Sequence, residues 1–309
     1  MRRLLALTIA LASVALAALP GRAADIVVHL HDGARLPDPT GITVWANSPE
    51  TRISVHNPGT SVVRTRLHWR NTLQDAYLVT PQGVAEAPGQ AGDGLTSDAL
   101  LGAGSRGEWE LASNARQRYV FSVSSGHLAP APVATAEFAI HLGDSGLPVR
   151  ALMTRLQEGP HPTYVLPGVT DSRARFEDAV GRTSRTFRMG PDRFVVIDST
   201  DRRLAHRQLT WVRSLMARAR QDRTRRVFAF IHHPPQSGRA HQSLRRADSV
   251  ALLAALAGGP PVTLFAARRP GLHAFARNGV QVVTVGPGQH VEARVDETGI
   301  DLSVKGLKP

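Results

Sequence analysis

Two adjacent histidines follow a short apolar segment in the second half of the chain. Residues 227–231 are too few for a helix and have the composition of a buried parallel strand. His232 and His233 come next, and two prolines end the strand. Because ligands of α/β proteins bind at the carboxyl ends of such strands, the histidine pair is a candidate functional site. The alternative is a surface loop that happens to contain two histidines.

The preceding residues predict the elements that position this pair. Residues 192–197 have the composition of another strand. Residues 204–219 repeat apolar side chains at helical spacing, with arginines on the other faces. A strand, a helix and a second strand make a βαβ unit with a right-handed crossover.

Three segments of this unit carry a resemblance to a known family. They are Ile197-Asp198-Ser199, Gln208-Leu209-Thr210-Trp211-Val212 and His232-His233-Pro234. The block resembles the calcineurin-like metallophosphoesterases, especially their secreted, purple-acid-phosphatase-like members. The resemblance implies an α/β/β/α sandwich and hydrolysis of phosphoesters by two metal ions.

The resemblance also implies metal ligands, only some of which this chain retains. His127, Asp144 and His232 stand at ligand positions of the family's motifs. Other positions hold residues that the family does not use there, namely Ser125 for an Asp, Val169 and Thr170 for an Asn-His pair, and Arg268 and Pro270 for two histidines. One carboxylate and two histidines suit one divalent ion (iron, zinc or manganese) better than two, so we expect at most one ion or none.

Four further residues are candidates for a role at this edge. His233 and His141 are candidate proton donors, should the chain be catalytic. Arg268 and Arg239 are candidates for binding a phosphorylated or other anionic ligand.

The N-terminus has the pattern of a secretory signal peptide. A charged start, the apolar residues 4–19 and small residues before Ala24 predict cleavage after Ala23, and hence a periplasmic or secreted protein. Cleavage would lower the formal charge of the 309-residue chain from +12 to +9, because it removes Arg2, Arg3 and Arg22. This charge favours anionic partners, but no nucleic-acid-binding motif accompanies it, and no later segment is apolar enough to span a membrane.

The remaining pattern predicts two domains after the signal peptide of residues 1–23. Residues 24–117 contain short strand candidates separated by turns, as in an immunoglobulin-like or fibronectin-like β-sandwich, with a long loop at 83–107. Residues 118–309 would form a trimmed metallophosphoesterase-like α/β domain. Two functions remain open: a phosphoester hydrolase with weak or lost activity, or a non-catalytic protein whose basic cleft binds an anionic ligand or a protein partner.

Overall fold

The computed structural model describes residues 26–38, 41–83, 85–86, 94–127, 135–236, 242–267 and 273–306. Arg239 and Arg268, the predicted anion-binding residues, lie outside these ranges, as do the signal peptide and its cleavage site. No helix of the described part is long and apolar enough to cross a bilayer.

The N-terminal part consists of two sheets that face each other. Sheet I has the strand order β1-β4-β9-β6-β7 and sheet II the order β2-β3-β5-β8. The strands are β1 (Val27–His31), β2 (Gly33–Leu36), β3 (Ile42–Ala46), β4 (Arg52–His56), β5 (Val63–Arg70), β6 (Ala76–Val79), β7 (Ala85–Glu86), β8 (Leu95–Leu101) and β9 (Arg106–Ser113).

The predicted long loop at 83–107 is wrong in part, because it contains β8. Residues of β8 alternate between buried and exposed, and the strand pairs with β5 along its whole length. Two of its inward residues are the small Ser97 and Ala99, so the alternation is weakly hydrophobic and hard to distinguish from a loop.

The C-terminal part contains two mixed sheets. Sheet III has the order β12-β11-β10-β19-β20 and sheet IV the order β13-β14-β15-β16-β18-β17. The strands are β10 (Tyr119–Ser124), β11 (Phe138–His141), β12 (Thr163–Val165), β13 (Arg185–Met189), β14 (Asp192–Ile197), β15 (Val227–Ile231), β16 (Val262–Ala267), β17 (His273–Arg277), β18 (Val280–Val285), β19 (Gln289–Val295) and β20 (Ile300–Gly306).

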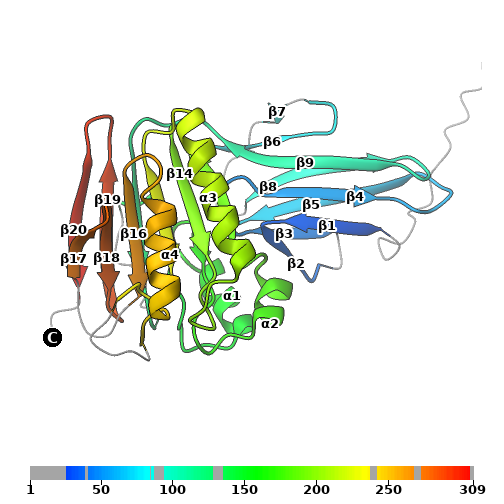
Figure 1. Cartoon of the computed structure of the whole chain (residues 1–309). Coiled ribbons are helices and arrows are strands. Elements are labelled where there is room, and N and C mark those ends of the chain that lie inside the picture. The colour runs from blue at the N-terminus through cyan, green and yellow to red at the C-terminus, as the bar shows by residue number, and fades with distance from the viewer. Residues whose placement is uncertain are drawn as a thin grey trace, which may run out of the picture.

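Four helices accompany these sheets: α1 (Val149–Gln157), α2 (Arg173–Ala179), α3 (His206–Gln221) and α4 (Arg246–Leu256). Helices α3 and α4 lie side by side over sheet IV (Figure 1) and share an apolar cluster with its outward side chains. Helices α1 and α2 pack against Trp45 and Val165, where the N-terminal part meets β12. The predicted βαβ unit is present, since β14 and β15 pair in parallel with α3 between them.

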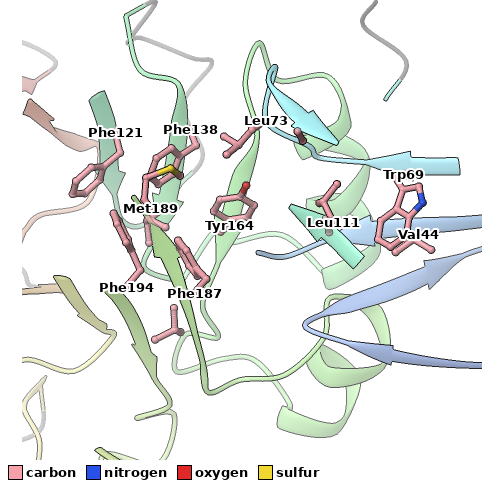
Figure 2. Close-up of a cluster of buried hydrophobic side chains, with 14 of the residues drawn as sticks. Val44, Trp69, Leu73, Leu111, Phe121, Phe138, Tyr164, Phe187, Met189 and Phe194 are labelled. Carbon is pink, nitrogen blue, oxygen red and sulfur yellow. The ribbon is translucent and has the colours of Figure 1, made fainter. Parts of the chain in front are cut away.

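Aromatic side chains fill the space between sheets III and IV. Phe121 of β10 lies against Phe194 of β14 and Phe228 of β15, with ring centroids 5.3 and 5.1 Å apart. The same apolar cluster continues into the N-terminal sheets, and Figure 2 shows Tyr164 between the phenylalanines and Trp69. The predicted boundary at 117/118 therefore lies within one continuous core.

Two asparagines join the N-terminal part to β12, the edge strand of sheet III. Asn47 accepts a hydrogen bond from the Val165 N–H at 2.9 Å and donates to the Val165 carbonyl oxygen at 3.3 Å. Asn71 forms the same pair of bonds with Thr163, at 2.7 and 3.0 Å. Each side-chain amide thus bonds the strand edge as a neighbouring strand would, which satisfies backbone groups that an edge strand leaves unpaired.

Candidate functional site

The candidate site lies where the carboxyl ends of β10, β11 and β15 meet. Strands β10 and β11 pair in parallel, so their following loops leave the same edge of sheet III. The Gly126 N–H donates to the Gly143 carbonyl oxygen at 3.1 Å, which holds these two loops together. His232 follows β15 and reaches this edge from the facing sheet.

Asp144 and His232 form the centre of the site. The His232 Nδ1 lies 2.6 Å from the Leu142 carbonyl oxygen, which can only accept, so Nδ1 carries a proton and donates it. The His232 Nε2 then lies 3.3 Å from Asp144 Oδ2. The structure therefore brings together two residues that follow different strands and lie 88 positions apart in the chain, as the strand-end argument predicts.

The Asp144 carboxylate is occupied by donors of the protein itself. Its Oδ1 accepts the backbone N–H of Val169 at 2.8 Å. Burial alone would raise the pKa of Asp144, but hydrogen bonds from His232 and from the backbone N–H groups of Val169 and Thr170 outweigh burial and hold the pKa at about 2. Asp144 is thus an anion at neutral pH whose oxygens already have partners.

Glycines allow the loops around Asp144 to approach closely. Asp144 itself has a left-handed backbone, with φ of 57°. A Cβ added to Gly168 would lie 2.3 Å from the Asp144 backbone nitrogen, so only glycine fits there. The loop that carries Val169 is therefore pressed against the Asp144 loop, and this contact produces the short Val169 hydrogen bond.

His233 has a second, separate set of contacts. Its Nδ1 donates to the Ser199 carbonyl oxygen at 2.6 Å, and its backbone N–H donates to Ser199 Oγ at 3.0 Å. Burial, helped by the neighbouring His232, lowers the pKa of His233 to about 4. The predicted role of His233 as a proton donor stays a prediction.

His141 is fully buried on the outward side of sheet III. Its Nδ1 lies 3.1 Å from Ser124 Oγ on the adjacent strand, and its Nε2 has no hydrogen-bond partner among the described residues. Burial, with smaller effects from His232 and His290, lowers the pKa of His141 to about 3. A group that is 1% exposed cannot reach a substrate in this conformation, which argues against the predicted role of His141 as a proton donor.

His127 lies near the site without joining it. Its ring packs against Gly146, two residues after Asp144, where an added Cβ would approach its Cε1 to 2.5 Å. In the described residues, the side chain of His127 makes no hydrogen bond or ion pair. Its predicted role as a metal ligand stays a prediction.

The remaining family positions offer few donors for a metal. Ser125 donates its hydroxyl to the Val285 carbonyl oxygen at 2.9 Å, and the apolar Val169 side chain is 54% exposed. Across the ranges that the structure describes, no group of three or more His, Asp or Glu side chains lies close enough to hold a metal ion. The donor set does not fit two ions, because Asp144, which would bridge them, is bonded to protein donors and its neighbouring positions lack ligand atoms.

The Gln-Leu-x-Trp-Val segment has a positioning role that sequence reasoning missed. Gln208, in the first turn of α3, donates to the Asp198 carbonyl oxygen at 3.0 Å and to Ser184 Oγ at 2.8 Å. Asp198 accepts hydrogen bonds from Arg173 at 2.7 Å and from the Thr200 hydroxyl at 2.7 Å. Gln208 thus helps to fix the loop whose Ser199 orients His233. The available signal in the sequence was the position of this motif in the helix that follows a strand end.

A separate hollow of about 1860 Å³ lies between the N-terminal part and α1. Its lining mixes cationic, acidic and apolar side chains, and it contains none of the predicted site residues. We therefore place the candidate site at the Asp144–His232 edge.

Comparison with known proteins adds a likeness of fold. No family model and no curated protein matches the sequence. Among solved structures, a dimetal phosphatase from Danio rerio is 14% identical with a TM-score of 0.49, and the match covers 61% of this chain and 96% of that chain. A Streptococcus pneumoniae protein described as a predicted phosphoesterase is 10% identical with a TM-score of 0.35, covering 62% and 91%.

A third match is vacuolar protein sorting 29 from Cryptosporidium parvum, at 7% identity and a TM-score of 0.35, covering 63% of this chain and 100% of that chain. These likenesses lie at low sequence identity and at TM-scores below 0.5, so the predicted resemblance to the metallophosphoesterases stays a prediction.

Proposed function

We propose that the chain is an exported protein that keeps an α/β/β/α phosphoesterase fold behind an N-terminal β-sandwich but has lost two-metal phosphoester hydrolysis. It acts by binding an anionic, phosphate-like ligand or a protein partner. The observation that carries this proposal is that the Asp144 carboxylate already accepts hydrogen bonds from the backbone N–H groups of Val169 and Thr170. A bridging carboxylate needs free oxygens, and hydrolysis of this type needs two ions.

The formal charge of +9 that remains after the proposed signal cleavage supports an anionic ligand. Arg239 and Arg268 remain its proposed contacts.

Metal content and hydrolysis, measured together, test the proposal. The full chain is incubated with excess manganese, zinc and ferrous iron in turn, desalted, and assayed for bound metal and for hydrolysis of an aryl phosphate. We expect less than one equivalent of metal, and hydrolysis no greater than that of an Asp144→Asn variant. Inorganic phosphate or tungstate should raise the melting temperature of the wild type, and replacing Arg239 and Arg268 by Gln should remove that increase.

Two equivalents of metal, with hydrolysis abolished by Asp144→Asn, would overturn the proposal. If hydrolysis is absent as proposed, Ser125→Asp, Val169→Asn, Thr170→His, Arg268→His and Pro270→His should raise the rate only in combination, because residues of one metal site act as a unit.

A second candidate is weak hydrolysis with a single ion. The orientation of His232 favours it, because a ring whose Nδ1–H bonds a backbone carbonyl presents its Nε2 as metal-binding histidines do. One equivalent of metal, with slow turnover that His232→Ala abolishes, would identify this function. His127, Asp144 and His232 are its proposed ligands.

A further inference from the structure

The outward face of α3 carries arginines and no acidic residue. The sequence of α3 is HRQLTWVRSLMARARQ, and its arginines are Arg207, Arg213, Arg218 and Arg220. At 100° per residue, Arg207 and Arg218 lie on one flank of the exposed surface, and Arg213 and Arg220 lie on the other. All four are exposed, and in the part of the chain that the structure describes none of them takes part in an ion pair.

Helix stability explains only part of this arrangement. Arg218 and Arg220 occupy the last turn of α3, where cations interact favourably with the helix dipole. Arg207 lies in the first turn, and Arg245 and Arg246 begin α4, where the dipole disfavours cations. These helix starts are neighbours, because the Arg245 N–H donates to the Arg202 carbonyl oxygen at 3.1 Å. Crowding of cations at two helix starts costs stability and therefore points to a binding role.

The neighbouring helix α4 presents an apolar outward side. Val250 is 53% exposed, and Ala247 and Ala254 are exposed on the same side. Of the nearby acids, Asp248 lies against the Leu204 backbone N–H at 3.4 Å, and Asp222 pairs with Arg188 and Arg193. We call these outward sides of α3 and α4 together the α3–α4 face; they lie side by side in Figure 1.

We propose that the α3–α4 face binds the anionic headgroups of a lipid bilayer. Two parallel helices form a broad surface rather than a groove, with arginines about 16 Å apart along α3. Guanidinium groups bind phosphate with two parallel hydrogen bonds. The exposed apolar side chains of α4 can lie at the boundary between lipid headgroups and acyl chains. These side chains would add nothing to the binding of a soluble polyanion, so they favour a membrane as the partner.

Vesicle binding tests this proposal with the full-length mature protein. Flotation with vesicles of phosphatidylglycerol and phosphatidylcholine is compared with phosphatidylcholine alone. We expect binding only to the anionic vesicles, and its loss in high salt. Arg207→Gln, Arg213→Gln, Arg218→Gln and Arg220→Gln together should lower the partition coefficient at least about tenfold, because each cation near an anionic surface contributes a factor of several. Glutamine is also a good helix former, so α3 should remain folded.

A matched control removes the same number of charges elsewhere. Arg52, Arg64, Arg66 and Arg118 are exposed, and each pairs with an acid outside the α3–α4 face. Their combined change to Gln should leave vesicle binding within about twofold of wild type. Equal losses in both variants would mean that only net charge matters and would overturn the proposal. So would absence of vesicle binding, or tighter binding of soluble polyphosphate through the same arginines.

Discussion

Asn47 and Asn71 should determine whether the two halves of the protein unfold together. Each side chain bonds both the N–H and the carbonyl oxygen of one residue of β12. Asn47 is fully buried, so its replacement by Ala leaves the Val165 N–H without water or another acceptor. The double change Asn47→Ala and Asn71→Ala removes every side-chain bond by which these two residues hold the strand edge.

The expected loss follows from the orphaned groups. A buried donor that loses its acceptor costs about 1–3 kcal/mol. The Val165 carbonyl oxygen keeps a bond from Arg185 at 3.0 Å, so the Val165 and Thr163 N–H groups dominate the cost. Asn71 also has a left-handed backbone, with φ of 63°, so Ala there adds a cost of about 1 kcal/mol. We therefore expect the free energy of unfolding to fall by about 5 kcal/mol in the double variant, a large fraction of the roughly 5–15 kcal/mol of a typical protein.

Urea unfolding and hydrogen exchange measure this together. Tryptophan fluorescence follows Trp45, Trp69 and Trp109 of the N-terminal part together with Trp211 of α3, and far-ultraviolet circular dichroism follows the whole chain. In the double variant, amide exchange at residues 162–166 should accelerate by at least about tenfold, since a factor of ten corresponds to 1.4 kcal/mol.

Asn57→Ala is the control for this experiment. Asn57 donates to Ser61, Leu101 and Gly102 within the N-terminal part, so its loss destabilises that part without touching β12. Exchange at 162–166 that stays at the wild-type rate in the double variant, or a change in unfolding free energy below about 1 kcal/mol, would refute the reasoning.

Two further predictions concern the site. Asp144→Ala should lower stability by about 2 kcal/mol, because two backbone N–H groups lose their acceptor and Ala disfavours the left-handed backbone at this position. Asp144→Asn keeps an acceptor and tolerates that backbone, so it should lower stability less. Thermal melts of the two variants test this difference. The pKa of His141 is about 3 when folded, below its unfolded value near 6.5, so the unfolded state binds the extra proton between these values. Stability is therefore fully present above pH 6.5 and declines as pH falls, by about 2 kcal/mol at pH 5. Urea titrations at pH 8 and pH 5 should show a smaller decline in His141→Leu than in a His29→Leu control, and equal declines would contradict this account.

Local sequence patterns predicted the parts of the fold that depend on neighbouring residues. The strand at 227–231 and the helix that precedes it were predictable because their apolar periodicity acts over a few positions. The meeting of Asp144 with His232 followed from the rule for strand ends.

Long-range pairing was not predictable. Asn47 and Asn71 look like ordinary turn residues, and only the folded chain shows that they bond β12. The contact of the Val169 N–H with Asp144 likewise depends on two loops from different strands. The sequence showed which side chains replace the family's metal ligands. It did not show that the Asp144 carboxylate accepts hydrogen bonds from the backbone of the neighbouring loop.

The position of β19 in sheet III has a consequence for the order of folding. Sheet IV is built from β14, α3, β15, α4 and β16 in chain order, so its contacts are short in sequence and can form early. In sheet III, β10 has β11 on one side and β19 on the other, and the register joins Phe121 to Ala293. The loop closed by that pairing spans most of the C-terminal part. One edge of β10 therefore cannot pair until nearly the last residues of the chain have been made. Sheet III should therefore be completed late, and a nascent or truncated chain ending before β19 would expose one unpaired edge of β10, open to aggregation.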